Sequence, residues 1–149
     1  MDRIIIRKGL KTDLKDAFAR VKELAEYEKA AVEVATSVKT YELDFEAGWF
    51  ELLVAETEAG ENLGIMIYYN TFSTWKGRML FLEDFVVAEN ARRKGVGEKL
   101  WAELVKIAKQ KKCALVKWQV LDWNEPARKF YLKFGAELEP GWENGKLFL

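Results

Sequence analysis

Histidine is absent from this sequence of 149 residues, which also contains one cysteine and two prolines. The absence of histidine excludes a Ser-His-Asp triad, a histidine general base and a zinc site with histidine ligands. The single cysteine, Cys113, excludes a disulfide within the chain. Because no histidine is present to activate its thiol, we interpret Cys113 as a packing residue. We therefore expect no bound metal.

An excess of charge of either sign is also lacking, because 24 basic residues are balanced by 24 acidic ones. Proteins that bind nucleic acid usually carry a basic excess, so we expect no nucleic-acid partner. Basic residues cluster at 92–94 and at 106–112, and we interpret the second cluster as the solvated end of a helix. No apolar run approaches the ~20 residues that span a bilayer, and no signal-peptide pattern opens the chain. We expect a cytoplasmic protein with no membrane partner.

The length of the chain indicates one domain, residues 1–149, of mixed α/β class. We expect an antiparallel meander followed by a strand–helix–strand–helix series. The expected strands are 4–6, 50–56, 63–70, 79–87 and 114–121, with two short strands within 137–149. The expected helices are 13–29 with Thr12 as its cap, 31–38, 95–111, and a short helix capped by Asn124, with Pro126 in its first turn, and ended by Gly135.

The most informative segment joins the apolar run 80–87 to the helix that starts near residue 95. Between them lies the basic glycine loop Arg92-Arg93-Lys94-Gly95-Val96-Gly97. Glycines let the backbone approach an anion, and the N-terminus of the helix adds partial positive charge, so the segment is typical of a phosphate site. The spacing does not match a P-loop or a dinucleotide fingerprint. A solvated basic turn is the alternative interpretation.

The positions of Arg92, Gly95 and Gly97 resemble the Arg/Gln-x-x-Gly-x-Gly/Ala signature of the GNAT acetyltransferases. Further segments resemble the spermidine/spermine acetyltransferase branch of that family: 22–28, 82–85, 122–126, 130–131 and 134–136. The stretch 73–78 is similar to the thialysine N-epsilon-acetyltransferase members of the branch. The resemblance covers nearly the whole chain, with residues 30–62 matching least.

The resemblance implies a fold and a cofactor site. The fold is a mixed, mostly antiparallel sheet flanked by helices, in which the strands near 80–87 and 114–121 run parallel and splay apart around acetyl-CoA. The implied cofactor contacts are Phe85, Val86, Val87, Arg92, Arg93, Lys94, Gly95, Val96, Gly97, Glu98, Asn124, Glu125, Pro126, Ala127 and Tyr131. We expect the main chain of 85–87 to pair with the pantetheine arm and to polarise the acetyl carbonyl.

The resemblance also assigns two catalytic residues, Glu83 and Tyr131. An alkyl ammonium with a pKa of ~10.4 is protonated at neutral pH and must lose a proton before it attacks. We expect Glu83 to bind the ammonium and accept that proton, directly or through water, and Tyr131 to protonate the departing thiolate. Strand alternation predicts Glu83 and Phe85 on one face, and Leu82 and Asp84 on the other. The alternatives are an ion pair of Glu83 with a lysine or arginine, and a packing role for Tyr131.

The predicted function is acetyl transfer to the primary amine of a small molecule by direct attack in a ternary complex. The implied pocket residues are Tyr27, Glu28, Trp75, Glu83, Lys117, Trp118 and Gln119. Polyamine-acetylating relatives typically carry aspartate where this chain has Ser73, so a thialysine-like or lysine-like amine is expected first, and diamines or polyamines second. Alternatives are a protein or peptide lysine acetyltransferase and a non-catalytic acyl-CoA-binding regulator. Members of the branch are usually homodimers, which we also expect here.

Overall fold

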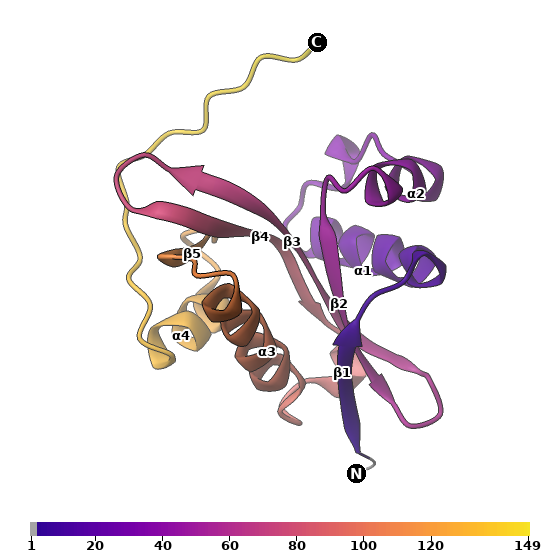
Figure 1. Cartoon of the computed structure of the whole chain (residues 1–149). Coiled ribbons are helices and arrows are strands. Elements are labelled where there is room, and N and C mark those ends of the chain that lie inside the picture. Colours follow the sequence, from indigo (N-terminus) through magenta and orange to yellow (C-terminus); the bar gives the residue numbers. More distant parts are fainter. Residues whose placement is uncertain (1–2) are drawn as a thin grey trace. The chain divides into compact units, whose positions relative to one another are not determined.

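The computed structural model describes residues 3–149 and forms two compact units, one running to Gln119 and the other comprising Val120–Leu149. The strands of the first unit are β1 (Ile4–Lys8), β2 (Glu51–Thr57), β3 (Asn62–Ser73), β4 (Gly77–Val87) and β5 (Leu115–Trp118) (Figure 1). Its helices are α1 (Leu14–Tyr27), α2 (Val38–Glu46) and α3 (Val96–Gln110), with short 3-10 turns η1 (Lys11–Asp13), η2 (Ala31–Glu33) and η3 (Glu89–Ala91). The second unit contains α4 (Glu125–Lys133). Within residues 3–149, every helix is too short or too polar to cross a membrane.

The strands form one sheet in the order β1-β2-β3-β4-β5. Neighbouring strands are antiparallel except β4 and β5, which are parallel. This arrangement confirms the predicted mixed sheet with one parallel pair. The ladder between β4 and β5 joins residues 79–82 to 115–118 only, so β5 is shorter than the expected strand 114–121.

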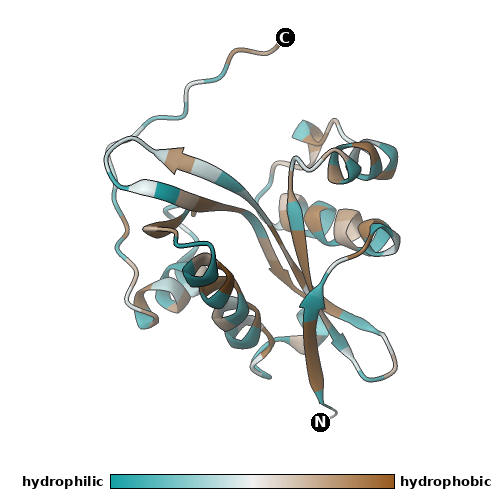
Figure 2. Ribbon diagram, in the orientation of Figure 1, coloured by the Kyte–Doolittle hydropathy of each residue, from teal (hydrophilic) through white to brown (hydrophobic). Residues whose placement is uncertain are grey.

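Helices cover both faces of this sheet, with α1 and α2 on one side and α3 on the other (Figure 1). The core under α1 and α2 includes alternate residues of the central strands, namely Val54, Ile65 and Ile67. The intervening residues Leu53 and Met66 are fully buried on the opposite face, because successive strand residues point to opposite sides. Hydrophobic residues accordingly gather in the central strands, while one side of α3 is hydrophilic (Figure 2).

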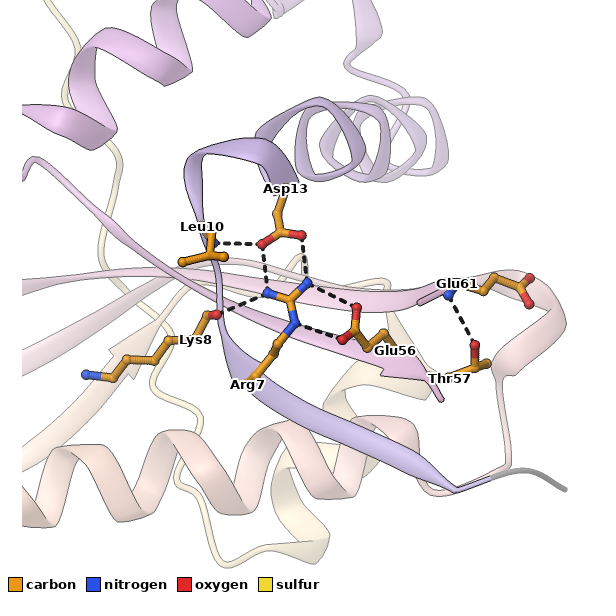
Figure 3. Close-up of polar contacts among 7 residues, drawn as sticks. All are labelled: Arg7, Lys8, Leu10, Asp13, Glu56, Thr57 and Glu61. Carbon is orange, nitrogen blue, oxygen red and sulfur yellow. Dashed lines mark hydrogen bonds and ion pairs between the residues drawn. The ribbon is translucent and has the colours of Figure 1, made fainter. Parts of the chain in front are cut away.

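The Arg7 guanidinium joins β1 to β2 and to the start of α1 (Figure 3). It donates two hydrogen bonds to Glu56, at 2.8 and 3.0 Å, and two to Asp13, both at 2.8 Å. A further bond of 3.2 Å reaches the carbonyl of Lys8, so all of its N–H directions are used. The hydrogen bonds from Arg7 lower the pKa of Asp13, which also accepts a bond of 2.7 Å from the Leu10 amide.

Lys111 ties the C-terminal end of α3 to two strands. Its Nζ donates to the Glu51 carboxylate on β2 at 2.6 Å and to the Asn70 side chain on β3 at 2.9 Å. Its amide also bonds the carbonyl of Ile107 at 2.9 Å, which satisfies one of the last carbonyls of the helix. The position of α3 on the sheet is therefore fixed at the end opposite the glycine loop.

Some local predictions are confirmed and others are wrong. Asn124 does cap α4, and Gly135, with φ of 83°, follows its end. Thr12 caps nothing, because α1 begins after Asp13. The expected helix 31–38 is only the turn η2, and α2 instead begins after Ser37, whose hydroxyl accepts from the Thr40 amide. Residues 137–149 contain no strand, because no segment of residues 3–149 forms a ladder with them.

Replacing Arg7 by methionine should leave the carboxylates of Asp13 and Glu56 close together and unpaired. The expected loss of unfolding free energy at pH 7 is about 2–4 kcal/mol, near the range for breaking a partly buried ion pair. Because the pKa of Asp13 is lowered on folding, its carboxylate stabilises the folded protein above the unfolded pKa of 3.8. This stabilisation is lost as the pH falls through the pKa of the folded state. Urea unfolding of both proteins should therefore give a difference that shrinks as the pH falls below about 4.

The matched control is Lys11→Met, which removes an exposed ion pair with Glu46. Ion pairs between solvent-exposed side chains contribute little to stability, so this variant should unfold nearly as the parent does. Equal effects of the two substitutions, or a difference for Arg7→Met that does not change with pH, would contradict the role given to Arg7.

Candidate active site

The glycine loop follows β4 and η3 and leads directly into α3. Two of its residues have positive φ, Arg93 at 61° and Gly95 at 83°. The Arg92 amide bonds the Glu89 carbonyl and the Lys99 amide bonds the Gly95 carbonyl, whereas in the described chain the amides of 93–97 donate to no backbone carbonyl. The first amides of a helix lack acceptors within it, and alternating backbone signs make such amides converge on an anion.

One buried alanine and one buried valine anchor this loop, while its charged side chains face solvent. Val96 is 1% exposed and Ala91 is 2% exposed, so each end of the loop is anchored in the protein. The side chains of Arg92, Arg93 and Lys94 are exposed. Backbone amides, cations and the positive end of α3 therefore act on the same region, which is the donor set that a pyrophosphate requires.

The strand β4 loses regular pairing on both of its edges at one point. On one edge the ladder with β5 stops at the pair Leu82–Trp118. On the other edge Tyr68 pairs with Leu82 and Ile67 pairs with Asp84, so Glu83 is an extra residue. Such a β-bulge bends the strand and increases its local twist. The parting of β4 from β5 and the bulge thus occur together at Glu83.

This bulge corrects the predicted alternation of side chains along β4. Before the bulge, Leu82 pairs with Tyr68, which is fully buried on the α3 side of the sheet. After it, Asp84 pairs with Ile67, a residue of the core under α1 and α2. Leu82 and Asp84 therefore face opposite sides, although regular alternation predicts the same side. The charges of Glu83 and Asp84 instead act on the same two tyrosines, Tyr41 and Tyr69.

Two carboxyl groups, Glu28 and Glu83, act on a third, Asp84, at this position. Burial, and then the charges of Glu83 and Glu28, raise the pKa of Asp84 to about 7. Burial also raises the pKa of Glu28, which follows the last residue of α1. Among residues 3–149, no lysine or arginine forms an ion pair with any of the three. The alternative of an ion pair for Glu83 is therefore not observed, and the group has the charge needed to hold an ammonium.

Two tyrosines border these carboxylates. The Tyr69 hydroxyl donates a hydrogen bond of 2.9 Å to Glu83, and its ring stacks on Phe81 at 5.4 Å. Burial and the bond to Glu83 raise the pKa of Tyr69 to about 12. Burial, followed by the charge of Asp84, raises the pKa of Tyr41 on α2 to about 12. Both phenols therefore stay protonated near neutral pH and remain hydrogen-bond donors.

Other predicted site residues of the first unit lie on several elements. Phe85, Val86 and Val87 continue β4 past the bulge, and the β4–β5 ladder stops before them. Tyr27 ends α1, beside Glu28. Trp118 packs edge to face on Trp101 of α3 at 5.2 Å. Lys117 is exposed on β5, and Gln119 follows that strand.

Trp75 lies apart from the carboxylates. It occupies the turn between β3 and β4 and is 85% exposed. The strand from Gly77 to Glu83 spans roughly 20 Å at ~3.3 Å per residue, so the hairpin tip is not next to the bulge. Ser73 belongs to the same turn, where its hydroxyl accepts from the Lys76 amide at 3.1 Å.

The second unit contains the remaining predicted residues. The Asn124 side chain accepts from the Ala127 amide at 3.4 Å and is buried. Glu125 begins α4 and pairs with Arg128 at 3.5 Å, and Pro126 occupies the first turn, where its missing N–H costs nothing. Tyr131 is 8% exposed and contacts the Phe130 ring at 5.7 Å.

Sequence reasoning missed Asp84, Tyr41 and Tyr69. Two consecutive acids inside the apolar run 80–87 were the available signal for a bulge, because a regular strand would direct one of them into the core. The tyrosines gave no such signal. No group of acidic or cysteine side chains in residues 3–149 is arranged to hold a metal ion.

Comparisons with known proteins identify similar sequences and similar folds. Residues 14–136 match the family model described as the acetyltransferase (GNAT) family. The chain is 34% identical over 143 residues to thialysine N-epsilon-acetyltransferase of Bos taurus, covering 90% of this chain and 84% of that protein. It is 28% identical to spermidine/spermine N(1)-acetyltransferase-like protein 1 of Homo sapiens, covering 95% of this chain and 22% of that protein. An aminoglycoside acetyltransferase from an uncultured soil metagenomic sample shares the fold, with a TM-score of 0.79 at 17% identity over 98% of this chain and 96% of that one.

A pair of substitutions in the glycine loop should shift stability in opposite directions. Left-handed backbone costs a side chain roughly 1–2 kcal/mol, whereas glycine loses roughly 0.5–1 kcal/mol of chain entropy. Arg93→Gly should therefore raise the unfolding free energy by up to about 1 kcal/mol. Gly95→Val should lower it by up to about 1 kcal/mol, because the same two quantities oppose each other there, although a Cβ meets no atom within 4 Å. Urea unfolding measures both, and a destabilised Arg93→Gly variant would refute the conformational argument.

Proposed function

The chain belongs to the GNAT acetyltransferase family and is an N-acetyltransferase, and from that premise we propose that it acetylates the primary amine of a small molecule with acetyl-CoA. The preferred acceptor is thialysine or a lysine-like amine, and diamines or polyamines come second. The observation that carries this proposal is the group of three carboxyls beside the bulge, which no lysine or arginine of residues 3–149 neutralises by an ion pair. A bound ammonium supplies the missing positive charge.

Acetyl-CoA, when bound, supplies an acetyl thioester. The loop 92–98 fits its pyrophosphate, because the amides of 93–97 lack backbone acceptors and three cations surround them. In the proposed complex the main chain of Phe85, Val86 and Val87 aligns the pantetheine arm as an added strand would. Asn124, Glu125, Pro126 and Ala127 line the other side of the cofactor.

The proposed reaction needs an anion to hold the amine and an acid for the leaving sulfur. Glu83 is the anion that faces the ammonium, and Tyr69 fixes its carboxylate through the hydrogen bond of 2.9 Å. Tyr131 is the acid, because a phenol with a pKa of ~10 can protonate a thiolate as it departs. Tyr27, Glu28, Lys117, Trp118 and Gln119 complete the proposed acceptor pocket. Trp75 stays outside this proposed pocket, because the hairpin tip is not next to the bulge.

Substrate preference rests on the relatives and on Ser73. The thialysine enzyme of Bos taurus is more similar to this chain than the human spermidine/spermine-like protein is. Ser73 carries no charge, and its hydroxyl is used within the hairpin turn, so this position offers no carboxylate for a second ammonium. Both observations favour an amine with the size of a lysine side chain over a long polyamine.

A panel of acceptors assayed with acetyl-CoA tests the proposed function. We expect thialysine to have the highest kcat/KM, at least tenfold above spermidine, with lysine between them and a histone-like peptide near background. Mass spectrometry of the products identifies the acetylated nitrogen and avoids interference from the Cys113 thiol in assays of released coenzyme A. A preference for the peptide would favour a protein acetyltransferase. Binding of coenzyme A without turnover of any amine would favour the alternative of a non-catalytic acyl-CoA-binding regulator.

Tyr131→Phe tests the assignment of the acid. Removing one general acid typically lowers turnover about 10²–10⁴-fold, and we expect a fall in that range, while calorimetry shows nearly unchanged affinity for coenzyme A. Tyr68→Phe is the matched control, because the Tyr68 hydroxyl is buried and has no hydrogen-bond partner in the described chain. This control should keep full activity. Unchanged turnover of Tyr131→Phe would remove Tyr131 from the acid role.

A further inference from the structure

Asp84 has a different environment from its neighbour Glu83, although the charges of both act on Tyr41 and Tyr69. Asp84 follows the bulge and pairs with Ile67, so it begins the part of β4 that covers the core under α1 and α2. It is half-buried, whereas Glu83 is exposed. One of the two carboxyls therefore lies mainly in protein and the other mainly in water.

The hydrogen bonds of the two groups also differ. Glu83 accepts a bond from the Tyr69 hydroxyl. The Asp84 carboxylate is joined to no donor in any described hydrogen bond or ion pair, so both of its oxygens are available. Among residues 3–149 the only fully enclosed side-chain oxygen or nitrogen without a partner is the Tyr68 hydroxyl, so the Asp84 carboxylate keeps contact with solvent. A proton can therefore both reach it and leave it.

We propose that Asp84, and not Glu83, accepts the proton of the substrate ammonium, a role that rests on the proposed function. In this step an N–H bond of the ammonium breaks, its electron pair stays on nitrogen, and an O–H bond forms at the Asp84 carboxylate. The neutral amine attacks the thioester carbon and a C–N bond forms, while the C–S bond breaks and the sulfur takes a proton from Tyr131. The nitrogen loses its second proton as the amide forms, and a proton from solvent restores the Tyr131 phenol. Asp84 then returns its proton to solvent. Glu83 holds the cation in place.

The groups that face Asp84 explain why it suits this role. Glu83 on β4 and Glu28 at the end of α1 oppose its ionisation, while Tyr41 on α2 and Tyr69 on β3 remain neutral phenols. With a pKa of about 7 instead of 3.8, the Asp84 carboxylate is roughly a thousandfold stronger base. A general base works best when its pKa lies near the working pH. The pKa of Asp84 therefore responds to a change in the charge of Glu83 or Glu28.

The test compares Asp84→Asn with Glu83→Gln, each of which removes one charge with little change of shape. We measure kcat/KM for the best amine of the panel between pH 5.5 and 9.5 at saturating acetyl-CoA. The parent should lose activity below about pH 7, because kcat/KM reports ionisations of the free enzyme. Asp84→Asn should lose this acid limb and at least a hundredfold in kcat at pH 8.

Glu83→Gln should keep the acid limb and shift it to lower pH, because one of the charges that opposes Asp84 ionisation is gone. Its KM for the amine should rise. An acid limb that survives in Asp84→Asn, or that disappears only in Glu83→Gln, overturns the proposal and assigns the proton to Glu83. A parent enzyme that acetylates no amine of the panel overturns the proposed function first, and this role with it.

A readout independent of catalysis accompanies the kinetics. Since the pKa of Asp84 is raised on folding, its contribution to stability is present below 3.8 and is lost as pH rises through about 7. Urea unfolding should show this decline in the parent and not in Asp84→Asn, which should be the more stable protein at pH 8. Equal pH dependence in both proteins would refute the environment on which the proposal rests.

Discussion

One extra residue in β4 is the constraint on which the candidate site depends. Strand pairing forces side chains to alternate, and the bulge at Glu83 breaks that rule at the place where β4 leaves β5. The ladder with β5 ends at the same point, and the charges of both adjacent carboxyls act on Tyr41 and Tyr69. A regular strand would direct one of these carboxyls to the opposite face.

Glu83 and Asp84 then differ in their desolvation and in the charges that act on them. Asp84 is partly removed from water beside two other carboxyls, so its charged form is disfavoured. Glu83 stays in water and is held by a phenol. The loop at the start of α3 uses the opposite principle, because there the exposed amides and cations of 92–97 need an anion. The two ends of the proposed reaction centre are thus suited to ligand groups of opposite charge, an ammonium at the carboxyls and a pyrophosphate at the loop.

The sequence predicted those parts of the molecule that depend on local patterns. Periodicity located α1, α3 and the central strands, and the spacing of Arg92, Gly95 and Gly97 identified the loop. The bulge was missed although the two consecutive acids were a signal for it, because its position depends on which residues of β3 face Leu82 and Asp84. The helix α2 and the irregular segment 137–149 were also missed, because capping by Ser37 and the lack of a strand partner are decided by the surrounding chain. The half-buried position of Asp84 was missed for the same reason, because it depends on the register between β3 and β4.

The attachment of Lys111 to Glu51 and Asn70 has a consequence for ligand affinity. A helix that is tethered to the sheet at its far end, and seated on it by Val96 at its near end, presents its first amides in a fixed position. A preorganised receptor loses little conformational freedom when a nucleotide arrives. In the proposed complex, removing the Lys111 contacts would weaken phosphate binding from the opposite end of α3, without altering the loop residues assigned to the phosphate.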